Sequence, residues 1–254
     1  MTTQENLEQK VKILLTFCDK VNEVVRRDFN GFTVNRDNQP ALFCTALFMR
    51  VIENYDGIVL MNRNEMPINS FIVVRSMFEA YLILAKASAD SNFRDVYYNK
   101  FVREKVEHLE KIQKCMKEGR PIGFTLAKEE IDAIVSDFQK HKIDEITDKY
   151  GVYHLSKDLN HTDLYLSTYV YCNSFTHCDF ASLHRYFDTK GPLELVFNNQ
   201  TDKDIVLSTF MAIRIFLLSY EVYCIFFGRE KSAAIALIEE HNQIENEFRK
   251  MLIR

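Results

Sequence analysis

The sequence predicts an all-α protein, a single multi-helix bundle of about seven to nine helices with two central hydrophobic helices. Three observations favour this fold. The 254 residues include only 7 Gly and 4 Pro, and strands joined by tight turns usually need more of both. Apolar residues recur at spacings of three and four in most segments, as they do in helices. Hydrophobic residues also make up 47% of the chain, which is enough for a substantial core.

The predicted helices begin and end at residues that commonly mark helix ends. In the first helix, Leu7, Val11 and Leu14 recur at helical spacing. Pro40 and Pro67 suit the first turns of the second and third helices, where an N–H group would have no partner. The predicted helical segments are residues 4–27, 41–63, 68–89, 93–117, two short pieces within 125–150, 164–187, 205–228 and 231–253.

The third predicted helix is apolar on nearly all faces, whereas the fourth is apolar on one face only. Residues 68–89 are apolar on nearly all sides, which is typical of a helix at the centre of a bundle. Residues 93–117 are charged and amphipathic, and Gly119 and Pro121 end this helix. Residues 151–161 predict a loop before the next helix.

Residues 205–228 form the second hydrophobic helix, which has to be distinguished from a membrane span. Arg214 and Glu221 interrupt the segment, and its longest run without a charge is nine residues. A membrane-spanning helix needs about 20 mostly apolar residues with few charges. We therefore expect a buried core helix and no insertion into a membrane. The amphipathic segment 231–253 predicts the last helix of the bundle.

Composition narrows the classes of protein that fit. The net charge of −4 gives no broad basic surface, so DNA is not indicated as a partner. Six Cys occur without a Cys-x-x-Cys pair and without a signal peptide before them, which predicts reduced thiols in a cytoplasmic protein. No linker rich in Pro, Gly or Ser divides the chain, so residues 1–254 are predicted to form one helical domain.

Ionised residues interrupt the apolar helices and are the most informative feature of the sequence. Arg75 and Glu79 are four residues apart and share one otherwise apolar helix face. The charged residues expected inside the bundle are Arg50, Glu53, Arg75, Glu79, Arg214 and Glu221. An unpaired buried charge is strongly destabilising. These three cations and three anions therefore predict either an interhelical salt-bridge network or a polar pocket that binds an anion such as a phosphate.

A second candidate site lies in the helix expected from residue 164. Ser174 and His177 are three residues apart and meet on one helix face. Ser167, Ala181 and His184 extend this stripe of small and polar residues. A histidine beside a serine can act in acid–base chemistry, and the alternative is a core histidine that hydrogen-bonds a neighbouring Glu. The histidine spacings fit no common metal motif, so we expect no metal site and no cofactor.

Two motifs resemble a bacterial all-helical family that is catalogued only as a numbered domain of unknown function. The motifs of that family are an Arg-Ser-x-x-Glu helix and a later Ser-x-x-His helix. The matching residues in this chain are Arg75, Ser76 and Glu79, then Ser174 and His177. The resemblance covers residues 41–187 and continues with the hydrophobic helix that ends at residue 228. It implies an all-helical fold and brings no settled activity.

A looser likeness is to the HEPN superfamily of helical ribonucleases and toxin or defence components. The motif of that superfamily is an Arg followed, after four to six residues, by a His. Arg103 and His108 have this spacing. The likeness implies a dimer in which two copies of the motif meet one RNA phosphate.

Two functions from different classes follow from these patterns. The first expectation is a non-catalytic helical sensor or interaction protein, an accessory in bacterial defence or stress response, whose buried charges are structural. The alternative is a HEPN-like, metal-independent ribonuclease or other phosphate-directed enzyme. A homodimer, a protein partner and RNA stay open as partners.

The alternative assigns a role to each candidate residue. In this interpretation His177 is the general acid or base, Arg75 neutralises the phosphate, and Glu79 orients one of them. The residues assigned to substrate binding are Arg214, Glu221 and Ser174.

Overall fold

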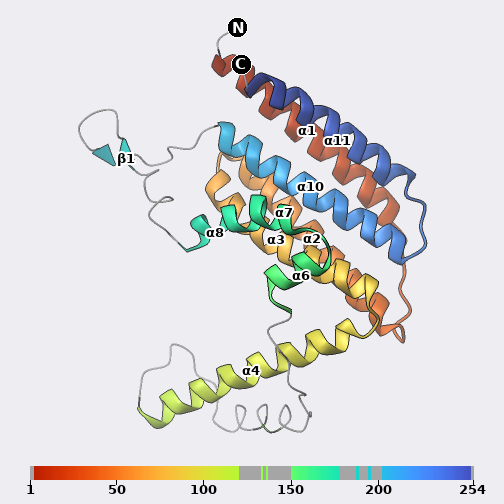
Figure 1. Cartoon of the computed structure of the whole chain (residues 1–254), viewed down its shortest axis with the longest axis vertical. Coiled ribbons are helices and arrows are strands. Elements are labelled where there is room, and N and C mark those ends of the chain that lie inside the picture. The colour runs from red at the N-terminus through yellow and green to blue at the C-terminus, as the bar shows by residue number, and fades with distance from the viewer. Residues whose placement is uncertain are drawn as a thin grey trace.

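The computed structural model describes residues 3–119, 150–177, 187–188, 194–195 and 202–252, together with Ala133 and Ser136. Within these residues the chain is an all-α bundle, as predicted (Figure 1). The helices are α1 (Thr3–Phe29), α2 (Gln39–Arg63), α3 (Pro67–Ala89), α4 (Phe93–Lys117), α6 (Val152–Asp158), α7 (Thr162–Leu164), the π-helix η2 (Tyr165–Val170), α8 (Tyr171–Thr176), α10 (Asp202–Phe226) and α11 (Ser232–Leu252). The strands β1 (Phe187–Asp188) and β2 (Glu194–Leu195) form one short antiparallel pair. Of the segment 125–150, in which two short helices are predicted, only Ala133, Ser136 and Tyr150 are described, and Ala133 and Ser136 are helical.

The predicted helix ends agree with the structure in most places. α4 has the predicted bounds, and α2 begins where the Asn38 side chain accepts a hydrogen bond from the Ala41 N–H group at 3.1 Å. The loop predicted for residues 151–161 is wrong over most of its length, because α6 occupies Val152–Asp158. Leu155 of α6 is buried against the bundle, so tertiary packing stabilises a short segment of mostly polar residues as a helix.

The centre of the bundle is formed by α2, α3 and α10, which contact one another more extensively than any other elements. α1 and α11 lie side by side along the outer surface of α10, whereas α6, η2 and α8 pack against α3 (Figure 1). α4 begins beside α3 and then points away from the bundle (Figure 1). The two hydrophobic helices predicted for the centre are therefore α3 and α10.

α3 and α10 are long and apolar enough to cross a membrane when judged by length and composition alone. In the fold, 56% of the most apolar stretch of α3 and 67% of that of α10 are buried. Core helices of a bundle satisfy the same criterion, and these buried fractions agree with the central positions predicted for the two helices.

Aromatic rings fill the contact between α2 and α10. The rings of Tyr55 and Phe216 stack with centroids 4.1 Å apart, and those of Phe48 and Tyr223 stack at 4.5 Å. All four side chains are almost completely buried. Each such pair contributes about 0.5–1.5 kcal/mol beyond the burial of its apolar area, so the two stacked pairs add to the stability of this contact.

A cluster of hydrogen bonds around Asn62 links the three central helices. The Asn62 side chain of α2 donates to Thr209 Oγ1 of α10 at 2.8 Å. Its Oδ1 atom accepts from Ser70 Oγ of α3 at 2.6 Å and from Ser208 Oγ of α10 at 3.1 Å. All four side chains are buried, and one amide therefore fixes the register of three largely apolar helices.

We expect Asn62→Ala to lower the free energy of unfolding by about 2–4 kcal/mol, because it removes three buried hydrogen bonds and leaves a small cavity. Urea denaturation measures this change. Asn64→Ala is the matched control, because Asn64 is exposed and its side chain hydrogen-bonds only the Leu60 carbonyl at the end of α2. Equal loss of stability in the two variants would contradict the role assigned to Asn62.

Candidate functional site

Arg75 connects α3 to the π-helix η2. Its Nη2 atom donates a hydrogen bond to Tyr169 Oη at 2.9 Å, and its guanidinium carbon lies 4.9 Å from the centroid of the Tyr169 ring. Its Nε atom lies 3.4 Å from Glu79 Oε1, an ion pair within α3. The Arg75 side chain is 21% exposed. Arg75 and Glu79 therefore do share one helix face, as predicted, and their partner is a tyrosine from another element.

The π-helix brings Tyr165 and Tyr169 together. Their rings stack with centroids 5.3 Å apart, and Tyr169 is buried beneath Arg75. Burial is the main cause that raises the pKa of Tyr169, against the lowering effect of the Arg75 hydrogen bond. Tyr169 is thus a neutral phenol at physiological pH. Single π-turns of this kind are frequent at functional sites, and nothing in the sequence pattern predicted this one.

Ser174 and His177 lie on and after α8, apart from Arg75 and Glu79. Ser174 Oγ donates to the Tyr171 carbonyl at 2.9 Å, a bond within its own helix. His177 is exposed and follows the last residue of α8. Within the described part of the chain, no hydrogen bond or ion pair joins His177 to Arg75 or Glu79. The predicted continuation of this stripe to Ala181 and His184 falls outside the described residues.

The prediction that six charged residues lie inside the bundle is wrong for three of them, which are exposed, and the other three, Arg75, Glu79 and Glu221, are only half-buried. Arg50 and Glu53 form an exposed pair on α2 at 3.6 Å, with side chains 60% and 66% exposed. Arg214 is exposed on α10, although Phe210 and Leu218 beside it are partly buried. A long arginine side chain can extend from the rim of an apolar interface into water, which is why apolar neighbours did not imply burial.

Tyr81 and His161 form a hydrogen-bonded pair that the sequence patterns did not predict. His161 directly precedes α7, and its Nε2 atom lies 2.7 Å from Tyr81 Oη of α3. Asn160 has a positive φ of 58°, and the His161 N–H group donates to the Ser156 carbonyl, so a tight turn holds the imidazole over α3. A tyrosine in an almost wholly apolar helix needs a hydrogen-bond partner, but its sequence gives no sign of which residue supplies it.

Arg214 and Glu221 of α10 act on this pair through their charges. Burial, and to a smaller extent the Arg214 cation, lowers the pKa of His161. Burial, and then the Glu221 carboxylate, raises the pKa of Tyr81. The pair is therefore neutral at physiological pH. In the described ranges no three His, Cys, Asp or Glu side chains gather closely enough to hold a metal ion.

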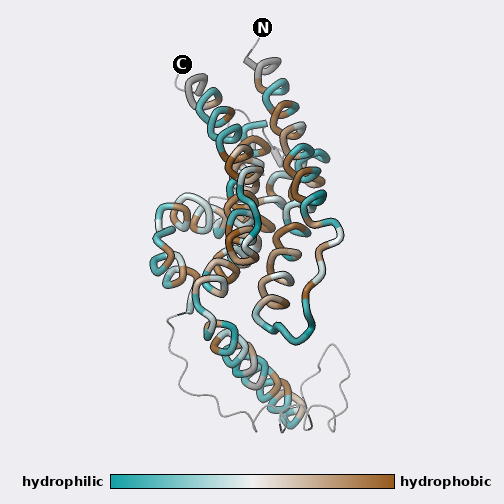
Figure 2. Tube along the Cα trace, turned by 90° about the vertical axis from the view of Figure 1, so that its right-hand side faces the viewer, coloured by the Kyte–Doolittle hydropathy of each residue, from teal (hydrophilic) through white to brown (hydrophobic). Residues whose placement is uncertain are grey.

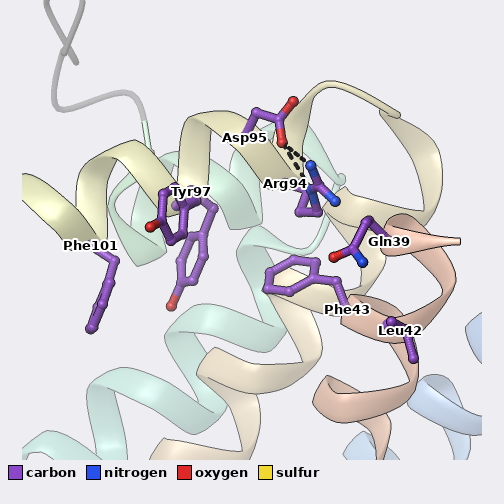
Figure 3. Close-up of a pocket in the computed structure, with 8 residues that line it drawn as sticks. Gln39, Leu42, Phe43, Arg94, Asp95, Tyr97 and Phe101 are labelled. Carbon is purple, nitrogen blue, oxygen red and sulfur yellow. Dashed lines mark hydrogen bonds and ion pairs between the residues drawn. The ribbon is translucent and has the colours of Figure 1, made fainter. Parts of the chain in front are cut away.

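A cavity lies between the first turns of α2 and α4, and we call it the α2–α4 groove (Figure 3). It has a volume of about 600 Å³. Its lining residues are Gln39, Leu42 and Phe43 from α2, and Arg94, Asp95, Tyr97, Tyr98 and Phe101 from α4. The rings of Phe43 and Tyr97 contact each other across it with centroids 5.8 Å apart (Figure 3). No residue of the α2–α4 groove was predicted as a site residue.

We expect Arg75→Met to lower the free energy of unfolding by about 1–3 kcal/mol, because it removes a mostly buried charged hydrogen bond to Tyr169. Arg50→Met, which breaks the exposed pair with Glu53, should change it by less than about 0.5 kcal/mol. Thermal and urea unfolding of both variants measure this difference, and a similar effect of the two substitutions would contradict it.

We also expect neutral His161 to make stability depend on pH. Because its pKa is lowered in the folded chain, protonation favours the unfolded state. The stability that neutral His161 contributes is fully present above its ordinary pKa of 6.5, and it is lost as the pH falls through the lower pKa of His161 in the folded chain. Buried His241 has a pKa lowered in the same direction. When the pH is lowered from about 7.5 to about 5.5, the free energy of unfolding, measured by urea denaturation, should fall less in His161→Gln than in the parent chain. In His154→Gln, whose histidine is exposed, it should fall by the same amount as in the parent chain.

Comparison with known proteins identifies a family. The chain matches the model of a family of unknown function (DUF5677) over residues 41–192, which include α2, α3, α4 and the segment from α6 to α8. No curated protein and no solved structure matches the chain. The predicted likeness to the HEPN superfamily gains no support from these comparisons. Because the matched residues are more than half of the chain, the protein belongs to the DUF5677 family of unknown function.

Proposed function

We propose that this protein is a non-catalytic interaction protein, and that the α2–α4 groove binds an apolar segment of a partner protein. The observation that carries the proposal is a pair of aromatic side chains in this groove. Tyr98 is 48% exposed and Phe101 is 52% exposed, and both line the same cavity. Aromatic side chains gathered in a surface cavity are typical of protein interfaces.

The chemistry of the lining favours an apolar partner segment over a nucleic acid. The only cation among the described lining residues is Arg94, which donates two hydrogen bonds to Asp95 at 2.8 and 2.5 Å. This cation is already neutralised, so the groove offers little attraction to a phosphate. The net charge of −4 agrees with this preference.

The groove is held in shape on the side of α4 that lies next to the bundle. Phe93, at the start of α4, is almost fully buried, and its ring contacts Tyr97 at 5.9 Å and Tyr150 at 5.6 Å. α4 then extends away from the bundle and carries apolar residues along its length (Figure 2). A partner segment therefore meets a cavity that is largely formed before binding, which limits the entropy lost on association.

Arg75 and Glu79, two of the three residues predicted to be catalytic, have structural partners. Arg75, Glu79 and Tyr169 contact one another, so the Arg75 cation is not free for a substrate phosphate. Cys172, which was not predicted as a site residue, is not a nucleophile at physiological pH either, because burial raises the pKa of its thiol to about 12. A cytoplasmic location and a part in bacterial defence or stress response stay predictions.

A random-peptide display selection on the purified chain tests the proposal. We expect selected peptides to share aliphatic or aromatic residues at helical or alternating spacing. Phe101→Ser and Tyr98→Ser should each weaken their binding by about 10- to 100-fold, because truncation of a central aromatic side chain removes most of the contact energy. Ile225→Ser is the matched control, because Ile225 is 56% exposed on α10 and does not line the groove.

Two outcomes would contradict this proposal. Peptides that bind Phe101→Ser as well as the parent chain would show that the groove is not the binding surface. Cleavage of labelled RNA by the parent chain, with loss of cleavage in His177→Ala, would favour the ribonuclease alternative instead. Light scattering adds a third arm: a dimer that Phe101→Ser converts to a monomer would make a second copy of this chain the occupant.

A further inference from the structure

A second cavity lies where the first turns of α1 and α10 meet the last turns of α11, and we call it the terminal pocket. It has a volume of about 360 Å³. Leu7, Val206, Leu207, Phe210 and Phe248 form its apolar wall. The helix ends that carry its lining residues lie at the end of the bundle opposite to α4, near the labelled chain termini (Figure 1). Its size is at the lower end of the range of roughly 300–1,000 Å³ that small-molecule sites occupy.

One positively charged residue, Lys10, lies among these apolar side chains. Lys10 of α1 lines the terminal pocket and is only 8% exposed. Its Nζ atom lies 5.4 Å from the centroid of the Phe248 ring. Among the described residues it forms no ion pair with a carboxylate. An aromatic ring stabilises an ammonium group less than a carboxylate does, so this cation can still accept an anion.

The charges at the pocket point to a ligand with one negative charge. The described charged lining residues are Lys10, Lys203 and Glu245, which sum to one positive charge. Glu245 disfavours a doubly charged anion such as a phosphate monoester, because like charges repel in a site of low dielectric constant. The apolar wall requires an aliphatic or aromatic body on the same ligand.

We infer that the terminal pocket binds a small amphipathic monocarboxylate, whose carboxylate pairs with the Lys10 ammonium while its apolar body packs between Val206, Phe210 and Phe248. The carboxylate gives the Lys10 ammonium a charged hydrogen-bond partner, and a charge-assisted bond of this kind is strong where water is excluded. Since the ligand contacts α1, α10 and α11 together, its binding stabilises the docking of the two outer helices on the core. This inference is independent of the function proposed for the α2–α4 groove.

Octanoate, 1-octanol and inorganic phosphate are the probes, and isothermal titration calorimetry and thermal unfolding of the full chain are the measurements. We expect octanoate to bind with one site per chain and to raise the melting temperature. 1-Octanol, which has the same apolar body, should bind at least about tenfold more weakly, and phosphate should not bind. The carboxylate could belong to a small molecule or to the C-terminus of a protein. Titration with a peptide that ends in Leu with a free carboxylate distinguishes these two sources.

Variants of Lys10 separate charge from packing. Lys10→Met should weaken octanoate binding about tenfold or more and leave the binding of 1-octanol unchanged, whereas Lys10→Arg should retain octanoate binding within about threefold. Lys12→Met, on the exposed side of α1, is the matched control. Far-ultraviolet circular dichroism checks that each variant is folded.

Several results would overturn the inference. The first three are that octanoate does not bind the parent chain, that octanoate and 1-octanol bind equally well, or that octanoate binds at many weak sites in place of one. The other two are that the peptide binds more tightly than octanoate, or that Lys10→Met and Lys10→Arg lose octanoate binding equally.

Discussion

Three apolar helices can slide or rotate against one another unless a polar contact fixes their register, and in this protein the Asn62 amide supplies that contact. It bonds to hydroxyl groups of both neighbouring helices at a point from which water is excluded. A buried amide left without these partners would cost free energy, so alternative registers are disfavoured. The stacked rings of Tyr55 and Phe216 then meet in one arrangement.

The fixed position of α3 decides what its polar residues can reach. One of its faces presents Arg75 to Tyr169 of the π-helix, and another presents Tyr81 to His161. Both contacts join α3 to the segment from α6 to α8, which also packs on α3 through apolar residues, as in the stacked rings of Phe71 and Phe175. The polar residues of α3 therefore add directional contacts to an apolar interface, and this role explains why they lie in a hydrophobic helix.

The two cavities lie at opposite ends of the bundle and differ in chemistry. The α2–α4 groove lies almost entirely within the residues matched by the family model, is aromatic, and has its one described cation neutralised. The terminal pocket lies outside the matched residues and contains a buried lysine that has no ion pair among the described residues. The first suits an apolar peptide segment and the second a small anion, so binding of a ligand at one end need not compete with binding of a protein at the other.

The sequence by itself determined the all-α class, the bounds of α4, the central positions of the two hydrophobic helices, and the shared face of Arg75 and Glu79. The bounds of α4 follow from the residues that end helices, such as Gly119 and Pro121, and the other features follow from helical periodicity within one segment. Only the tertiary structure decided that Arg214 is exposed, that Tyr81 meets His161, that residues 165–170 form a π-turn, and that Tyr98 and Phe101 line a cavity with Phe43. These features depend on which helices pack together and how closely, because a periodic pattern gives the apolar side of a helix but neither the edge of its interface nor a partner eighty residues away.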